Sequence, residues 1–321
     1  MSHPSHPEGV RFGIHAGQQN TTFDEYLKLW QTVESLGFDW ASVFDHFLPI
    51  QSDPEGPCFD GLTLLSALAA QTSTIRCGVI VVGVTYRNPA VLANIATTID
   101  HVSGGRLELG LGGAWYELEH NQYNAQFPRI GTRLDMLDEA MQIVKSMWTR
   151  HRSSFAGKHF TIEDALCEPK PVQQPHPPLW VGGMGEKKTL RVVAAHADGW
   201  NTFLMPRDAY QHKLNILADH AKAVGRDPDE VRKQLVVQAV VGDNDKDVED
   251  RVNMLAETRN ASPEQIRQRA LVGTAEQVAE ILSGYTAMGV RDFLIGARPP
   301  AALQTLELIA TKVAPAVKAA V

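Results

Sequence analysis

Residues 76–112, RCGVIVVGVTYRNPAVLANIATTIDHVSGGRLELGLG, decide the fold. The unbroken apolar run within Arg76–Val82 is typical of a strand buried on both faces, as in a parallel sheet. Pro89 suits the first turn of a helix, which is predicted to run to Val102 and to end at Ser103-Gly104-Gly105. Arg106–Leu111 then reads as the next strand. The stretch is therefore predicted to be a strand–helix–strand unit.

The same alternation extends in both directions along the chain. Strands are predicted at Val10–His15, Trp40–Phe44, Arg76–Val82, Arg106–Leu111, Leu179–Gly182, Gly199–Phe203, Gln234–Val241 and Arg291–Ile295. Helices are predicted between Thr22 and Gly37 and at Leu62–Thr72, Pro89–Val102, Ile130–Thr149, Glu186–Ala197, Arg207–Val224, Ala275–Met288 and 301–317. Eight alternations favour an α/β fold of the (β/α)8 TIM-barrel type. A doubly wound sheet is the alternative, because periodicity does not reveal closure.

Two stretches interrupt the rhythm. Residues 151–178 are rich in proline and are read as an excursion with one short hairpin, and residues 243–271 are read as an intervening polar segment. Neither stretch divides the chain into halves that could each form a barrel. We therefore predict a single domain over residues 1–321, with residues 1–9 as a loose tail.

Charge and composition exclude several classes of function. Lys plus Arg number 30 and Asp plus Glu 37, so the formal net charge is −7. A protein that follows a phosphate backbone is usually basic, so no nucleic-acid partner is predicted. The hydrophobic fraction of 44% excludes a disordered chain. No apolar run approaches the ~18 residues of a membrane span, so no membrane partner is predicted.

The cysteines and the N-terminus indicate the compartment. Cys58, Cys77 and Cys167 form no CxxC pair, which argues against a disulfide framework or a thiolate zinc site. The first residues have neither the basic nor the apolar region of a signal peptide. These features predict a cytoplasmic protein. A homodimer is compatible with the sequence but is not specified by it.

Chemistry in a barrel is expected where strands end and βα loops begin. Two glycine clusters follow neighbouring predicted strands, Gly110-Leu111-Gly112-Gly113-Ala114 and Gly182-Gly183-Met184-Gly185. The second precedes a helix start, where backbone N–H groups favour an anion, so it resembles a cradle for a phosphorylated cofactor. The alternative is that these glycines only form turns or helix caps.

A further polar pair, Asp45-His46, follows the second predicted strand. It could act on a bound molecule, or it could be a capping Asp beside a structural His. Trp115-Tyr116 could line a pocket or serve as a packed lid. The chain has no G-x-G-x-x-G fingerprint, P-loop, H-E-x-x-H or G-x-S-x-G motif, so no metal site and no serine hydrolase are predicted.

Several ordered runs together resemble the bacterial-luciferase-like monooxygenase superfamily, and most closely its branch of coenzyme F420-dependent oxidoreductases. The resemblance covers about residues 10–317. The runs that carry it are Phe44–Phe47, Gly83–Ala93, Ile99–Gly112, Trp115–His120, Pro178–Gly183, Ala197–Asn201 and Val272–Ala279.

The resemblance implies a TIM barrel with insertions in its βα loops near 48–60, 151–178 and 243–271. A deazaflavin would lie at the carboxyl-end mouth, and His46 would be the catalytic residue that assists proton movement. A non-prolyl cis peptide is implied at Ile80–Val81. The implied cofactor-binding residues are Asp45, His46, Ile80, Val81, Val82, Gly83, Gly112, Gly113, Ala114, Gly182, Gly183, Met184 and Gly185.

Departures from the family pattern narrow the function. The Glu that sugar-phosphate dehydrogenases of this branch carry falls here on Trp115 or Tyr116, so glucose-6-phosphate dehydrogenase activity is not expected. This aromatic pair instead suggests an apolar substrate pocket. Related sequences often have Thr where Val82 stands. We expect hydride transfer between F420 and an unidentified small molecule; an FMNH2-dependent monooxygenase and a non-catalytic flavin- or deazaflavin-binding protein are the alternatives.

Overall fold

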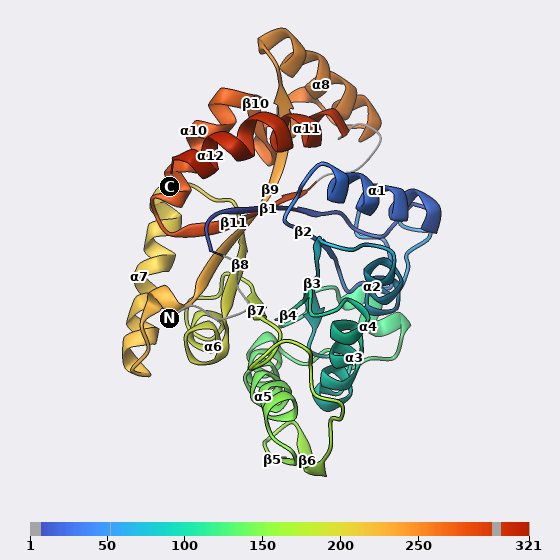
Figure 1. The fold of residues 1–321 in the computed structure, drawn as a ribbon, viewed down its shortest axis with the longest axis vertical. Coiled ribbons are helices and arrows are strands. Elements are labelled where there is room, and N and C mark those ends of the chain that lie inside the picture. Colours follow the sequence, from blue (N-terminus) through green and yellow to red (C-terminus); the bar gives the residue numbers. More distant parts are fainter. Residues whose placement is uncertain (1–7, 52, 297–302, 321) are drawn as a thin grey trace.

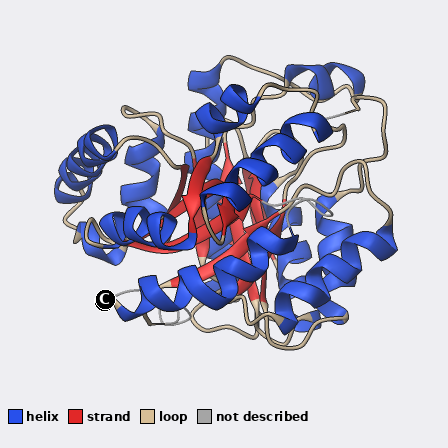
Figure 2. Ribbon diagram, turned by 90° about the horizontal axis from the view of Figure 1, so that it is seen from above, coloured by secondary structure: helices blue, strands red, loops and turns tan. Residues whose placement is uncertain are grey.

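The computed structural model describes residues 8–51, 53–296 and 303–320. Eight parallel strands within them close into a barrel, because β8 pairs with β9 as well as with β7. Figures 1 and 2 show the strands at the centre and the helices around them. The predicted TIM barrel is confirmed and the doubly wound sheet is excluded. The barrel strands are β1 (Arg11–His15), β2 (Trp40–Val43), β3 (Arg76–Gly83), β4 (Leu107–Gly112), β7 (Leu179–Gly182), β8 (Gly199–Phe203), β9 (Arg232–Gly242) and β11 (Val290–Gly296).

The helices that follow these strands bury their apolar stripes against the barrel. Thr22 and Glu25 form the predicted capping box at the start of the first helix. The helix predicted from Glu186 begins three residues later, at Thr189, after the loop that carries the glycines. The outer helices are α1 (Phe23–Ser35), α2 (Gly61–Ala70), α3 (Pro89–Val102), α5 (Ile130–Thr149), α6 (Thr189–His196), α7 (Arg207–Ala223) and α10 (Ala275–Thr286).

The chain ends in an interrupted helix rather than one continuous helix. It comprises α11 (Leu303–Leu308), a π-helical turn (Ile309–Val313) and α12 (Ala314–Ala319). Pro315 has no N–H to donate to the turn before it, which accounts for the widened backbone there. Residues 301 and 302 of the predicted closing helix, and 1–7 of the predicted tail, lie outside the described residues.

Two insertions project at opposite ends of the long axis of the molecule (Figure 1). One is the antiparallel hairpin of β5 (Ser153–Ala156) and β6 (Thr161–Ala165), as predicted for 151–178. The other corrects the interpretation of 243–271 as merely polar. It contains α8 (Asp245–Thr258), α9 (Pro263–Arg269) and β10 (Leu271–Thr274), which pairs with the far end of β9. Val248, Val252 and Ala256 recur every fourth residue on α8 and are buried in a small core of their own.

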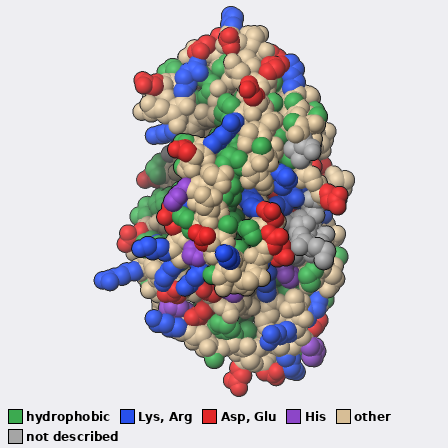
Figure 3. All heavy atoms as spheres, turned by 90° about the vertical axis from the view of Figure 1, so that its left-hand side faces the viewer, with side chains coloured by type: hydrophobic (Ala, Val, Ile, Leu, Met, Phe, Trp, Pro, Cys, Tyr) green, Lys and Arg blue, Asp and Glu red, His purple; other side chains and the backbone are tan. Residues whose placement is uncertain are grey.

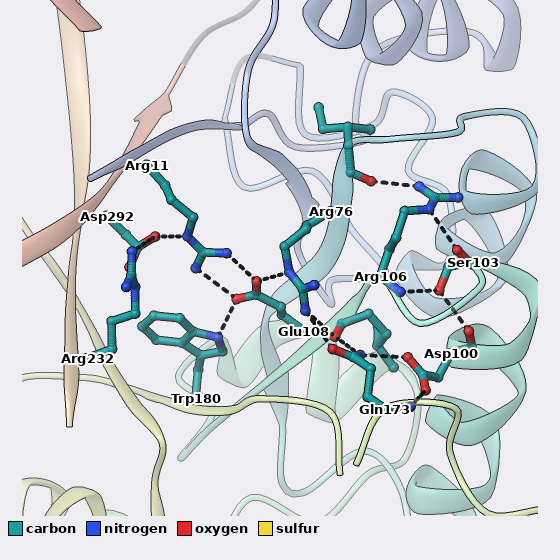
Figure 4. Close-up of polar contacts among 12 residues, drawn as sticks. Arg11, Arg76, Asp100, Ser103, Arg106, Glu108, Gln173, Trp180, Arg232 and Asp292 are labelled. Atoms are coloured by element: carbon teal, nitrogen blue, oxygen red, sulfur yellow. Dashed lines mark hydrogen bonds and ion pairs between the residues drawn. The ribbon is translucent and has the colours of Figure 1, made fainter. Parts of the chain in front are cut away.

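The amino-terminal end of the barrel interior is filled by a buried ion network (Figure 4). Arg11 donates to both Asp292 and Glu108, with Nη1 2.6 Å from the Glu108 carboxylate. Glu108 also accepts from Arg76 and from Trp180 Nε1, the latter at 2.8 Å. Burial works to lower the pKa of Arg11, but Asp292 and Glu108 outweigh it and the pKa is raised.

Arg232 completes this network by donating to the other oxygen of Asp292. The charged groups here are therefore surrounded by partners of opposite sign, which is the condition for burying them without a large penalty. We call Arg11, Arg76, Glu108, Arg232 and Asp292 the lower network.

On the outside, acidic and basic side chains are interspersed over the face on which α7 lies (Figure 3). The net charge of −7 is thus not concentrated in one acidic patch on this face. Among the described residues, no helix is both long enough and apolar enough to cross a membrane.

Candidate functional site

A cavity of about 660 Å³ lies at the carboxyl ends of the barrel strands. This is the end at which TIM-barrel loops build binding and catalytic sites. Twelve of the thirteen residues proposed for the cofactor line it. The remaining lining residues are His15, Phe44, Ile50, Tyr86, Trp115, Ile130, Leu134, Thr189, Asn201, Phe203 and Val236.

Val82 is the exception among the predicted residues. Its side chain is fully buried in the core between barrel and helices and does not line the cavity. Neighbouring residues of a strand point to opposite faces, so Val82 cannot share the inward face of Val81. The absence of a Thr hydroxyl at this position therefore removes nothing from the cavity wall.

The floor of the cavity contains the implied cis peptide. Ile80–Val81 is cis, and the pairing of β3 with β4 shifts between Val79 and Val82. The Val81 side chain is held between two strands, since a Cβ on Gly112 would stand 2.5 Å from Val81 Cγ2 and one on Gly182 would stand 2.8 Å from Cγ1. These two glycines thus make room for Val81, a packing role that neither earlier interpretation included.

The loop after β7 carries the second glycine cluster. Gly183 has a φ of +132°, which side-chain-bearing residues rarely adopt, and the loop leads directly into α6. Lys187, exposed in this loop, has no hydrogen-bond or ion-pair partner within the described ranges. Backbone N–H groups at a helix start form a setting for an anionic group.

The loop after β4 is held from outside the cavity. Arg133, on α5, donates from Nε to the Gly113 carbonyl oxygen at 2.8 Å. Ala114 adopts a positive φ of 55°. This arrangement fixes the backbone that presents Trp115 to the mouth.

The contacts of Asp45 hold neighbouring segments of the protein together. It is 2% exposed and accepts from Arg87 Nη1 at 2.8 and 2.7 Å. Arg87 also donates to Asp60, the residue that caps α2. Burial raises the pKa of Asp45, against the opposing pull of Arg87. Asp45 thus joins the β2, β3 and α2 segments behind the cavity wall.

His46 is the better placed of the pair for chemistry. Its Nδ1 lies 2.8 Å from Glu119 Oε2, and Tyr86 donates to the same oxygen at 2.6 Å. The other Glu119 oxygen accepts from the backbone N–H groups of Phe47 and Leu48, at 2.6 and 2.8 Å. A carboxylate surrounded by donors requires Nδ1 to carry a proton, so in the neutral ring Nε2 is the acceptor.

The pKa shifts of Glu119 and Tyr86 support the assignment of a proton to His46 Nδ1. Burial works to raise the pKa of Glu119, but the hydrogen bonds from His46 and Tyr86 outweigh it and the pKa is lowered. Burial and the hydrogen bond to Glu119 raise the pKa of Tyr86, so its hydroxyl stays a donor. Nε2 of His46 has no partner in the described part of the chain, and the ring lines the cavity.

His15, the last residue of β1, was not identified from the sequence although it also lines the cavity. Ser42 donates its hydroxyl to the Ile14 carbonyl and therefore accepts from His15 Nδ1, at 2.9 Å. Burial, together with the nearby His46, lowers the pKa of His15 to about 4. His15 is thus a neutral imidazole at physiological pH, with Nε2 as its acceptor.

Aromatic and aliphatic side chains surround the mouth. Trp115 stacks on Tyr116 with ring centroids 5.0 Å apart, and each forms a T-shaped contact with His46. Trp115 and Phe203 are each 61% exposed, although both are large apolar side chains. Apolar groups exposed around a concave site indicate an apolar ligand.

The residues fit a flavin-like group. The floor is apolar and shaped by Val81, the glycine loop supplies donors for a phosphate, and Asn201 offers a polar side chain at one wall. Asn201 donates to Gln234 Oε1 at 2.6 Å, and the buried Gln234 Nε2 has no acceptor in the described part of the chain. Among the described residues, no group of three or more His, Cys, Asp or Glu could hold a metal ion.

A profile of the family described as luciferase-like monooxygenase matches residues 6–292. The chain belongs to this family. An uncharacterized protein of Mycobacterium tuberculosis, Rv0953c, is 34% identical over 164 residues, which are 51% of this chain and 56% of the relative. The luciferase-like chain thus spans little more than half the length of this relative.

Two relatives with assigned names differ in the reaction that their names give. An F420-dependent glucose-6-phosphate dehydrogenase of Microbacterium testaceum is 29% identical over 225 residues, 69% of this chain and 66% of that one. The pyrimidine monooxygenase RutA of Stutzerimonas stutzeri is 33% identical over 162 residues, 49% of this chain and 44% of that one. Both of these relatives are named as redox enzymes.

Solved structures share the luciferase-like fold over nearly the whole chain. An F420-dependent secondary alcohol dehydrogenase aligns with a TM-score of 0.82 at 20% identity, covering 97% of this chain and 99% of that one. The monooxygenase RslO1 of Streptomyces bottropensis aligns with a TM-score of 0.80 at 22% identity, covering 95% and 99%. At these identities the likeness establishes the fold alone.

Proposed function

We propose that this protein is an F420-dependent oxidoreductase that acts on a small organic substrate in the 660 Å³ cavity. The observation that carries the proposal is the orientation of His46. Glu119 holds Nδ1, while Nε2 has no partner among the described residues on the cavity side. The site thus provides one positioned proton acceptor or donor beside an apolar space.

Bound F420 would supply a two-electron hydride carrier whose C5 gives or takes the hydride. The residues that would hold it are those of the floor around Val81 and of the loop from Gly182 to Gly185. Trp115 and the other apolar residues of the mouth would exclude water from the site.

The chain's own contribution is proton handling. Neutral His46 can accept a proton from a substrate hydroxyl at Nε2, and the imidazolium can return one to a carbonyl oxygen. In the protonated ring, the positive charge faces the ionised carboxylate of Glu119 at 2.8 Å, which stabilises it. His15 is poorly suited to this role at neutral pH, because its lowered pKa makes the neutral ring a weak base and leaves almost no imidazolium to donate a proton.

The second candidate is an FMNH2-dependent monooxygenase, and the likeness to the monooxygenase RutA favours it. A flavin ring and its phosphate would need the same apolar floor and the same glycine loop. The two functions differ in their use of O2 rather than in any residue of the site. A protein that binds a flavin or deazaflavin without turnover is the third possibility.

Equilibrium titration of the purified chain with F420 and with FMN tests the proposal. We expect micromolar binding of F420, about −8 kcal/mol, and weaker binding of FMN. Anaerobic reduction of F420 by a panel of small alcohols would then establish turnover. Tight FMN binding with no detectable F420 binding, or O2 consumption coupled to FMNH2 oxidation, would refute it.

A further inference from the structure

A second, smaller recess lies beside the main cavity. Its volume is about 120 Å³, and it shares His15, Phe44, Ile50, Phe203 and Val236 with that cavity. Its remaining lining residues come from the ends of β1 and β2, from β9 and β11, and from the residue that ends α8. They are Gly17, Gln19, Gln51, Gln238, Arg259 and Gly296.

The recess lies across the mouth from the glycine loops. In the closed barrel, β11 and β1 stand diametrically opposite β4 and β7, which carry those loops. An anionic group seated in the recess would therefore be separated by the width of the barrel from one seated at Gly182–Gly185. The two positions can recognise two different groups.

Three side chains in the wall of the recess have hydrogen-bond donors without partners among the described residues. Gln19 is 3% exposed, and its Oε1 accepts from the backbone N–H groups of Ile50 and Gln51 at 2.5 and 3.2 Å. This fixes the amide so that its Nε2 group remains as a donor. The amide of Gln238 and the guanidinium of Arg259 likewise have no partner. Gln19 is buried, Gln238 is half-buried and Arg259 is exposed, so the three donors are open to a ligand that enters the recess from the mouth.

Among the residues that the structure describes, no carboxylate pairs with the exposed guanidinium of Arg259. Burial lowers its pKa, and the neighbouring Arg269 adds to the effect. The guanidinium nevertheless stays charged, so it can attract an anion into the recess. No Asp or Glu lines the recess within the described ranges, and the one carboxylate of the main cavity, Asp45, is taken by Arg87.

We propose that this recess binds the carboxylate of an otherwise apolar substrate. The planar fork of a guanidinium matches a carboxylate in a two-point contact, and the two amides can donate to the remaining lone pairs. The shared surface of Phe44, Ile50, Phe203 and Val236 would cover the apolar part as it extends toward His46. The inference rests on the proposed function only in placing the reacting end of the substrate in the main cavity.

A pair of isosteric probes separates charge from shape. 4-Phenylbutyrate and 4-phenylbutyramide are titrated calorimetrically into the full chain, with and without bound F420. We expect the acid to bind at least about tenfold more tightly than the amide. Arg259→Gln should reduce this ratio to about one, and Arg259→Lys should retain part of it because a charge remains without the fork.

Lys187→Gln is the matched control, because it removes the same charge at the opposite side of the mouth. It should leave the acid-to-amide ratio unchanged, which excludes a general effect of net charge. Gln238→Leu removes a donor without changing charge, and it should lower acid binding alone. F420 affinity, measured separately, should be unchanged in Arg259→Gln.

Equal binding of acid and amide to the wild-type chain would overturn the inference. A loss of F420 affinity in Arg259→Gln, with the acid-to-amide ratio intact, would also overturn it by assigning the recess to the anionic part of the cofactor. The probe titration without F420 does not depend on cofactor identity. If F420 fails to bind while the ratio holds, the proposed function fails and the carboxylate recess stands.

Discussion

The two ends of the barrel interior use charged and polar side chains in opposite ways. At the amino-terminal end, each guanidinium of the lower network meets a carboxylate and each of the two carboxylates meets more than one donor. At the carboxyl end, polar groups are held on one side only. Glu119 fixes Nδ1 of His46 and leaves Nε2 to the cavity, and Ser42 does the same for His15.

The difference shows how one barrel separates stability from chemistry. A buried charge with all its partners cannot take part in binding, because any ligand would have to replace a contact already made. A side chain that is oriented by one atom and unpartnered at another costs some stability but is ready for a substrate. Substitutions in the lower network should therefore reduce stability more than activity, and substitutions at the carboxyl end should reduce activity more than stability.

The largest effect is expected at the lower network. Glu108→Gln removes the carboxylate that faces the buried Arg11 and the partly buried Arg76, and so leaves both guanidinium groups undercompensated. Breaking a buried ion pair in this way costs about 3–5 kcal/mol of unfolding free energy. Urea denaturation at pH 7 measures it. A loss below about 1 kcal/mol would mean that the network contributes little and would erase the contrast between the two ends.

His46→Ala tests the opposite end. The positioned proton donor is removed, so single-turnover hydride transfer at saturating reduced F420 should fall at least about tenfold, within the 10²–10⁴ range that general acids provide. F420 affinity should be nearly unchanged. Unchanged single-turnover rates from pH 5.5 to 8.5 would contradict the role of His46. Rescue by added imidazole distinguishes lost chemistry from a disturbed site.

Glu119→Gln sharpens the comparison, because it keeps the shape of the side chain but moves the ring proton of His46 from Nδ1 to Nε2. The new amide oxygen would accept from Phe47 and Leu48 as before, so the amide N–H2 would face His46 Nδ1. Nδ1 must then accept, and the ring proton moves to Nε2. We expect about tenfold slower alcohol oxidation, with ¹⁵N NMR reporting the changed tautomer.

Tyr86→Phe is the matched control for this substitution. It removes one donor to Glu119 but leaves the His46 proton on Nδ1, so the tautomer should persist. The rate should change by much less than in Glu119→Gln. An unchanged tautomer in Glu119→Gln would remove Glu119 from the mechanism.

The smallest expected effect is on how the unfolding free energy depends on acidic pH, through His15 at the cavity. The pKa of His15 is about 4 in the folded chain and about 6.5 when unfolded. Between these values the unfolded state binds more protons, so this group makes the fold less stable as pH falls from 6.5 to 4. His15→Gln should lessen the loss of unfolding free energy between pH 7 and pH 5 by about 1 kcal/mol, after allowance for solvent at the cavity. Parallel wild-type and variant stability curves would contradict this.

Much of the fold could be read from the sequence because its signals are local. Strand runs, Pro89 at a helix start and the Thr22 capping box each act within a few residues. The helix α8 could have been found as well, since Asn244 caps it and its buried residues recur every fourth position. The abundance of charged residues in 243–271 obscured that pattern.

The site was less predictable because its key contacts are long-range. Glu119 lies on the short helix α4 (Glu117–Gln122) and is 73 residues from His46, and neither its capping pattern nor its spacing marks it. The sequence did single out His46 and the segment Trp115–His120, but not that the two meet. Arg259 and Gln19 are brought to one recess only by closure of the barrel. The cis peptide was anticipated through family resemblance and not through any local signal.

The packing of Val81 restricts how this site could be redesigned. Because Val81 occupies the space that a methyl group on Gly112 or Gly182 would need, an alanine at either position would require a smaller residue at 81 at the same time. Gly110 offers no such exchange, since its added methyl would also meet the Val79 carbonyl oxygen at 2.8 Å. Single-site libraries would therefore lose function across the floor, while paired libraries at 81 with 112 or 182 could recover it. Trp115 and Phe203, which are exposed, are the positions where single changes could alter substrate range and leave the floor intact.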